Sequence, residues 1–106
     1  MAGQRIAIKE NSTAGASGEE QFEMTTVWSV TWIGEGLTGT TTVEIDEFQS
    51  CWAGTGNEKE WTLIESRTID SSNNEVTVSD INPVAGLRVR VPTNPGGNVT
   101  AIIKWQ

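Results

Sequence analysis

The side chains best suited to chemistry are few, and they narrow what this chain can do. The sequence contains no histidine and one cysteine, Cys51. Ser-His-Asp and Cys-His centres both need a histidine base, so they are excluded, as are histidine-ligated metal sites. Cys51 has no obvious basic neighbour that would favour its thiolate form, which indicates an inert, partly buried thiol. A lone cysteine also excludes an intrachain disulfide.

Glu44, Asp46 and Glu47 form the densest group of acidic residues. On a strand, Glu44 and Asp46 would share one face about 6.6 Å apart, at a rise of ~3.3 Å per residue. A carboxylate-pair hydrolase would need such groups in a cleft, and a calcium site would need further oxygen ligands and usually a glycine-bearing loop. Neither context is visible, so the sequence favours a solvated strand face. We expect no enzymatic activity, no cofactor and no bound metal.

Five tryptophans in 106 residues raise the alternative of a carbohydrate-binding or adhesin-type module, because flat indole faces stack on other flat surfaces. Trp28 and Trp32, however, belong to an alternating apolar stripe, which is more typical of a core. Trp105 lies in a similar stripe near the end of the sequence. Trp52, in a long glycine-containing segment, is therefore the tryptophan that we expect to be available for a ligand.

These residues must be positioned by strands, because apolar and polar residues alternate with a period of two and no segment has a convincing helical period. The pattern predicts strands at residues 4–9, 21–33, 40–48, 60–66, 76–78, 87–91 and 99–105. It favours a single all-β domain over residues 1–106, an antiparallel β-sandwich or jelly-roll-like barrel of seven to eight strands. The expected core comprises Phe22, Met24, Trp28, Val30, Val43, Ile45, Trp61, Leu63, Leu87, Val89, Val91, Val99, Ala101 and Ile103.

The start of the chain predicts a different kind of structure. Residues 10–20 are small and polar without periodicity, which indicates a loop. Residues 1–20 are then a candidate N-terminal arm and loop that reaches a neighbouring subunit or the shell of a larger particle. This stretch lacks the apolar core of a secretion signal, and no apolar run of about 18 residues is present, so we expect no membrane segment and a protein made in the cytosol.

The net charge of −7 argues against a nucleic-acid partner, which normally requires a basic face. All 14 acidic residues lie within residues 10–80, whereas residues 81–106 carry three bases and no acid. The segment "GLRVRVPTNPGGNVTAIIKWQ" (86–106) predicts a hairpin that reverses at residues 94–97. Arg88 and Arg90 would project together from its outer face, with Lys104 on the returning strand.

Two uses of these bases stay open. They could pair with Glu44 and Asp46 in the same sheet, or they could contact an acidic surface of a neighbouring subunit or a larger particle. We favour the second. The candidate interface residues are Arg88, Arg90, Lys104, Trp52 and Arg5.

Residues 39–105 resemble the small β-sandwich structural proteins of tailed bacteriophage virions, which decorate or cement the head or form knobs. The resemblance rests on "TTTVEIDEF", "EWTLI", "GLRVRV", the glycine turn and "VTAII". It implies a non-enzymatic virion protein, assembled in the host cytoplasm, that binds the major capsid shell as a homo-oligomer, with a trimer favoured. The segment "DEFQSCWAGTGNEKE" (46–60) replaces a shorter serine-aspartate-glycine turn seen in many members.

Overall fold

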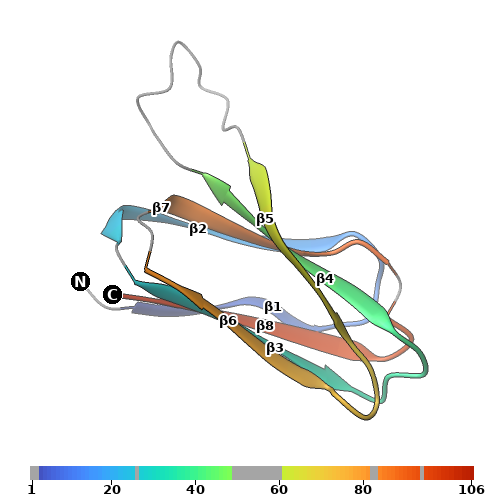
Figure 1. Cartoon of the computed structure of the whole chain (residues 1–106). Helices are drawn as coiled ribbons and strands as arrows, with labels where there is room; N and C mark the ends of the chain where they lie inside the picture. The colour runs from blue at the N-terminus through green and yellow to red at the C-terminus, as the bar shows by residue number, and fades with distance from the viewer. Residues whose placement is uncertain (1–2, 26, 49–60, 82–83, 94) are drawn as a thin grey trace.

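A computed structural model describes residues 3–25, 27–48, 61–81, 84–93 and 95–106, with the backbone alone for residues 21–25 (Figure 1). The described residues form eight strands and no helix, which confirms the all-β prediction. The strands are β1 (Gly3–Asn11), β2 (Ala16–Thr25), β3 (Trp28–Glu35), β4 (Thr41–Phe48), β5 (Thr62–Ile69), β6 (Glu75–Asp80), β7 (Val84–Val91) and β8 (Asn98–Trp105).

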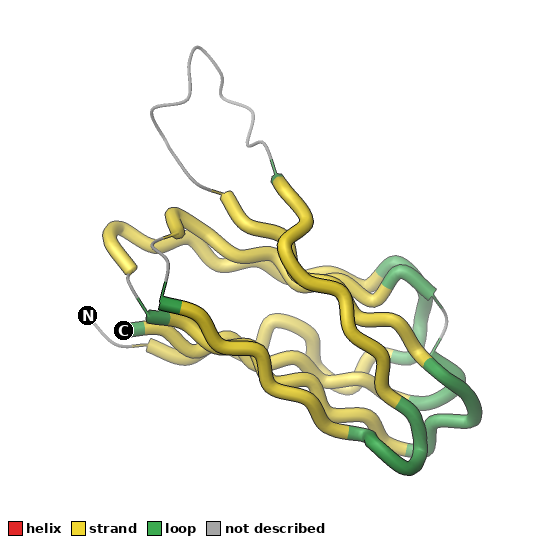
Figure 2. The backbone as a smooth tube through the Cα atoms, viewed as in Figure 1, coloured by secondary structure: helices red, strands yellow, loops and turns green. Residues whose placement is uncertain are grey.

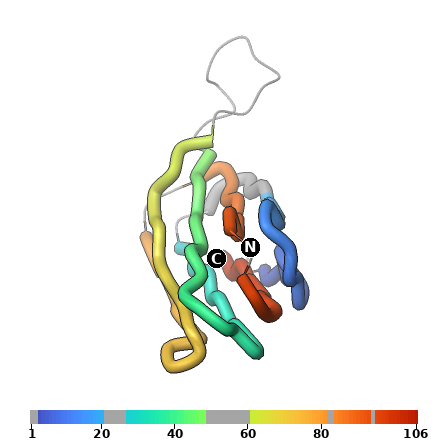
Figure 3. The backbone as a smooth tube through the Cα atoms, turned by 90° about the vertical axis from the view of Figure 1, so that its right-hand side faces the viewer, coloured from blue at the N-terminus to red at the C-terminus, as the bar shows by residue number. Residues whose placement is uncertain are grey.

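The strands form two antiparallel four-stranded sheets. Sheet A has the order β1-β8-β3-β6 and sheet B the order β2-β7-β4-β5. Figure 2 shows the two sheets as separate layers, and Figure 3 shows them from one end. Apart from β4 and β5, each strand lies in the other sheet from the strand before it, which is the arrangement of a jelly roll.

The core fills the space between the sheets and follows the predicted alternation. In β3, Trp28, Val30 and Trp32 are buried, while the residues between them are partly exposed. Most of the predicted core is confirmed: Trp28, Val30, Val43, Ile45, Leu87, Val89, Val91, Val99, Ala101 and Ile103 are all buried. The side chains of Phe22 and Met24 lie outside the described residues.

Strand β5 departs from the predicted core. Leu63 is 51% exposed and Trp61 is only partly buried, whereas Ile64 packs against the core and Ile69 is buried. The register of β4 against β5 shifts at this point: Ile45 pairs with Glu65, but Asp46 pairs with Leu63. Ile64 is therefore the extra residue of a bulge in β5, and Leu63 lies on the opposite face of the sheet from Glu65. A bulge between Ile6 and Ile8 similarly buries Ile8 and leaves Ile6 49% exposed.

The predicted strand 21–33 is two strands in different sheets. β2 ends at Thr25 in sheet B and β3 begins at Trp28 in sheet A. The loop predicted at residues 10–20 is also shorter than expected. Strand β2 already begins at Ala16, and the turn before it is held by Asn11 Oδ1, which accepts hydrogen bonds from the Thr13 backbone and hydroxyl. Residues 3–11 and 16–20 therefore lie in strands paired with β8 and β7 of the same chain.

The predicted terminal hairpin is wrong in its pairing. β7 ends at Val91 in sheet B and β8 begins at Asn98 in sheet A, so these two strands do not pair with each other. Gly96 has a φ of 67°, a left-handed backbone conformation that glycine adopts at no steric cost. A Cβ at Gly97 would come within 2.5 Å of the carbonyl oxygens of Glu35 and Gly36, so the turn packs directly on another stretch of backbone.

Candidate functional site

The most extensive side-chain network lies on the outer face of sheet B, where β4 and β7 are neighbours. Their register places Asp46 opposite Arg88 and Glu44 opposite Arg90. Arg90 donates from Nε to Asp46 Oδ2 at 2.6 Å and from Nη2 to Asp46 Oδ1 at 2.9 Å. Arg88 donates from Nε to the same Oδ2 at 2.8 Å. One carboxylate therefore holds two guanidinium groups, one of them in a bidentate contact.

Asp46 is 1% exposed, so its charge depends on these partners. Burial raises the pKa of the Asp46 carboxyl, but hydrogen bonds from Arg90 and Arg88 and their positive charges lower it more, and the pKa falls below its ordinary value. The hydrogen bond to Asp46 raises the pKa of Arg90; burial opposes this, and the charges of Asp46 and Glu44 add to it. Arg90 Nη1 also lies 3.3 Å from Glu44 Oε1.

Aromatic side chains flank this network. The Arg88 guanidinium carbon lies 4.9 Å from the centroid of the Trp61 ring, a cation–π contact. The Trp61 ring in turn lies 5.8 Å from Phe48, tilted by 49°. We call Asp46, Glu44, Arg88, Arg90 and Trp61 the sheet-B cluster. The exposed Leu63 on β5 lies opposite Asp46 in the register of β4 and β5.

The prediction that Glu44 and Asp46 lie on a solvated strand face is wrong for Asp46, whose side chain is buried. The reason is lateral cover: the long side chains of Arg88 and Arg90 come from the neighbouring strand and bind the carboxylate. The described residues contain no group of three or more histidine, cysteine or acidic side chains that could hold a metal ion. Arg88 and Arg90 pair with acidic residues of the same sheet, which is the use of these bases that we did not favour from the sequence. Whether they also contact another subunit remains a prediction.

The other candidate interface residues lie apart from the sheet-B cluster. Arg5 on β1 forms an ion pair with Glu20 on β2, at 3.3 Å, and so links an edge of sheet A to sheet B. Lys104 lies on β8 in sheet A. Trp52 falls outside the described residues. The structure therefore brings Arg88 and Arg90 together and places Arg5 and Lys104 on other strands.

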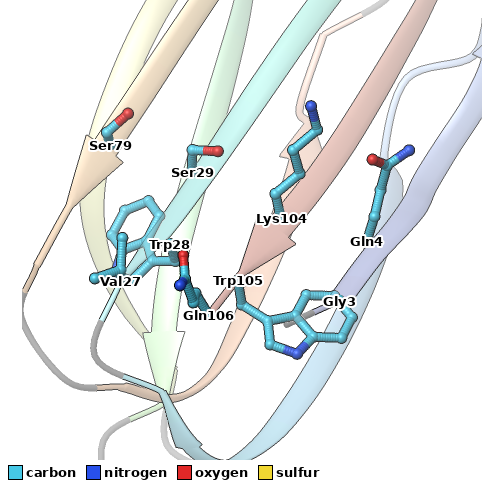
Figure 4. A pocket seen from close by; sticks show the side chains of 9 residues that line it. All are labelled: Gly3, Gln4, Val27, Trp28, Ser29, Ser79, Lys104, Trp105 and Gln106. Atoms are coloured by element: carbon cyan, nitrogen blue, oxygen red, sulfur yellow. The ribbon is translucent and has the colours of Figure 1, made fainter. Parts of the chain in front are cut away.

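A hollow of about 470 Å³ lies near the end of sheet A that holds Gly3 and Gln106 (Figure 4). It is lined by Gly3, Gln4, Val27, Trp28, Ser29, Ser79, Lys104, Trp105 and Gln106. Figure 4 shows Gln4, Lys104, Ser29 and Ser79 projecting from the same face of the sheet. The alternation of residues placed Lys104 on an outer face but did not predict the hollow. The sequence carries little signal for it, because the lining residues are aligned by pairing between strands that are distant in the sequence.

The sequence matches no protein-family model and no curated protein. Among solved structures, the SPBc2 prophage-derived protein YomS has a TM-score of 0.69 at 15% identity, over 99% of this chain and 92% of that one. The CBM32 module of AlyQ, solved with 4,5-unsaturated mannuronic acid, has a TM-score of 0.57 at 15% identity, over 92% and 74%. PirA has a TM-score of 0.52 at 14% identity, over 99% and 93%. At these identities the likenesses show the β-sandwich fold alone.

No described segment is a helix long and apolar enough to span a membrane.

Proposed function

We propose that this chain is a non-enzymatic structural protein of a bacteriophage virion, which decorates or cements the capsid by binding the major capsid shell as a homo-oligomer. A trimer would suit a threefold position on the shell. The protein would be assembled in the host cytoplasm and remain in the virion. It would act through its surfaces rather than through a catalytic centre.

The observation that carries this proposal is the end-to-end likeness to a prophage-derived protein. The likeness spans 99% of this chain and 92% of YomS, so one jelly roll accounts for nearly all of both chains. The resemblance of residues 39–105 to small virion proteins supports the same class. A jelly roll offers two broad sheet faces, which suits a protein that works by contact.

The surface that best fits a contact with the shell is the end of β4 and β5, beside the sheet-B cluster. Leu63 is exposed there and pairs in register with Asp46, and Trp61, which contacts Phe48 and Arg88, lies two residues before it. Aromatic and arginine side chains around an aliphatic residue are the composition of strong protein–protein contacts. Arg88 and Arg90 would set the orientation of docking, because Asp46 and Glu44 already hold them in fixed positions.

A carbohydrate-binding module is the rival class, and the fold of the AlyQ module keeps it open. The virion proposal is favoured because that module leaves about a quarter of its own length unmatched, whereas YomS is matched almost throughout. The tryptophan expected to bind a sugar, Trp52, lies outside the described residues. A glycan-array screen that found strong, Trp52-dependent binding would favour the rival.

The test is co-sedimentation of the purified protein with shells assembled from the major capsid protein encoded in the same gene cluster. The wild-type protein should enter the pellet saturably. Leu63→Asp should reduce binding at least about tenfold, because it places a charge in the apolar centre of the contact. Ile81→Asp is the matched control, since Ile81 is 75% exposed and follows β6 on the other sheet.

Three results would count against the proposal. Wild-type protein could fail to bind shells at every concentration, which would remove the function itself. Leu63→Asp could bind as well as Ile81→Asp, which would move the contact surface away from the β4–β5 end. Light scattering could find a monomer both in solution and on the particle, which would remove the homo-oligomer.

A further inference from the structure

The polar hollow on sheet A has the composition of a ligand site, and we infer that it binds an acidic saccharide through Lys104. This site lies on the other sheet from the proposed shell contact. It does not depend on the proposed function, so either can fail without the other.

A row of polar side chains crosses the whole width of sheet A at the hollow. The register places Gln4 opposite Lys104, Lys104 opposite Ser29, and Ser29 opposite Ser79. All four side chains project from one face (Figure 4). Directly opposite residues in a sheet have Cβ atoms about 4.5–5.5 Å apart. Four polar groups at that spacing form a track along which a chain of ligand hydroxyls could be matched.

The chemistry of the row suits a sugar. Serine hydroxyls and a glutamine amide each donate and accept hydrogen bonds, as sugar hydroxyls do. The hollow, at about 470 Å³, falls within the range of roughly 300–1,000 Å³ for small-molecule sites. Paired strands hold these side chains on a fixed backbone, which lowers the entropy cost of binding.

Lys104 gives the preference for an acidic ligand. Among the described residues, Arg5, Arg67, Arg88 and Arg90 each form an ion pair, whereas no carboxylate lies within ion-pair distance of Lys104. No acidic side chain is among the described residues that line the hollow. In a chain of net charge −7, this leaves one positive charge in a polar hollow without a protein partner. A carboxylate on the ligand would supply that partner.

Trp28 borders the hollow without adding a ligand contact. It lines the hollow, is 2% exposed, and its indole Nε1 has no hydrogen-bond partner among the described residues. Trp32 Nε1 is unpaired in the same way although Trp32 does not line the hollow, and both nitrogens have almost no accessible surface, so neither marks a ligand position. Trp105, whose ring occupies the space that a side chain at Gly3 would need, borders the same end of the sheet.

The test is calorimetric titration at low ionic strength with tri-galacturonate as the probe and the neutral trisaccharide maltotriose beside it. Tri-galacturonate should bind saturably and maltotriose at least about tenfold more weakly. Lys104→Gln should weaken tri-galacturonate binding about tenfold, as expected for loss of one charge-assisted hydrogen bond. Lys9→Gln, which removes another exposed lysine of sheet A, should leave it unchanged.

Gln4→Glu provides a second variant on an exposed residue. It places a negative charge beside Lys104 and should also weaken tri-galacturonate binding. The inference is overturned if tri-galacturonate does not bind saturably, if maltotriose binds equally well, or if Lys9→Gln weakens binding as much as Lys104→Gln. It is also overturned if Lys104 instead supports a salt-sensitive self-association that Lys104→Gln abolishes, because an acidic segment of a second copy would then be the occupant.

Discussion

Arg90 on β7 donates two hydrogen bonds, of 2.6 Å and 2.9 Å, to the carboxylate of Asp46 on the neighbouring strand β4. The contact joins a carboxylate that is almost fully buried to a guanidinium that is partly exposed. It fixes the outer face of sheet B and holds the arginine beside Glu44. Much of the stability of this face should therefore depend on one pair of residues.

Arg90→Gln should lower the free energy of unfolding by about 2–4 kcal/mol, because it leaves the buried Asp46 charge with Arg88 as its remaining partner. Arg67→Gln is the control, since Arg67 forms an exposed ion pair with Glu65 and should cost at most about 1 kcal/mol. Urea unfolding measures both values. Equal costs for the two variants would contradict a structural role for the Arg90–Asp46 contact.

The double variant Arg88→Glu with Arg90→Glu separates the two uses of the arginines that the sequence left open. The structure predicts that the isolated protein melts at a lower temperature, because two negative charges would face a buried carboxylate. Thermal melting by circular dichroism checks this. An unchanged melting temperature combined with lost oligomerisation would mean that the arginines act mainly between subunits.

Asp46 should also give the protein a pH dependence. Its folded-state pKa is below the ordinary value of 3.8, so at acidic pH the unfolded chain binds more protons than the folded one and stability rises with pH. The Asp46 contribution is complete above the unfolded pKa and is lost as the pH falls through the folded pKa. Melts between about pH 2.5 and 6 should show a steeper loss of stability for wild type than for Asp46→Asn. If the stability of wild type and of Asp46→Asn falls equally with decreasing pH, Asp46 does not cause the pH dependence.

The crossing between β7 and β8 should depend on Gly97. Gly97→Ala would push a methyl group against the carbonyl oxygens of Glu35 and Gly36, and overpacking of this kind costs about 1–3 kcal/mol. Gly39→Ala is the control, because a Cβ there meets nothing within 4 Å. Chemical denaturation of both variants gives the comparison. If Gly97→Ala leaves the free energy of unfolding unchanged, the backbone at Gly97 can move away from that of Glu35 and Gly36 at little cost.

The sequence predicted the strands well because alternation is a local signal. It could not assign strands to sheets. The stripe from Phe22 to Trp32 keeps one parity throughout, so nothing in the pattern marks the change of sheet between Thr25 and Trp28. The glycine turn at residues 94–97 looks the same whether it joins two strands of one sheet or crosses between two.

The sequence predicted which residues of the sheet-B cluster share a face, but it did not predict that one of them is buried. Parity correctly placed Glu44, Arg88 and Arg90 on one outer face, and charge suggested their pairing. The burial of Asp46 was not visible, because outward parity normally means exposure. It arises from the side chains of Arg88 and Arg90, which reach across from β7 and bind the carboxylate. These contacts join residues 42 and 44 positions apart in the sequence.

Cryo-electron microscopy of assembled shells can show whether the protein is a capsid-bound structural component, as we propose. Shells of the major capsid protein from the same gene cluster would be imaged with and without the purified chain. We predict added density at one class of symmetric positions on the shell surface, into which several copies of the jelly roll fit with Leu63 facing the shell. Identical maps with and without saturating protein would contradict the claim.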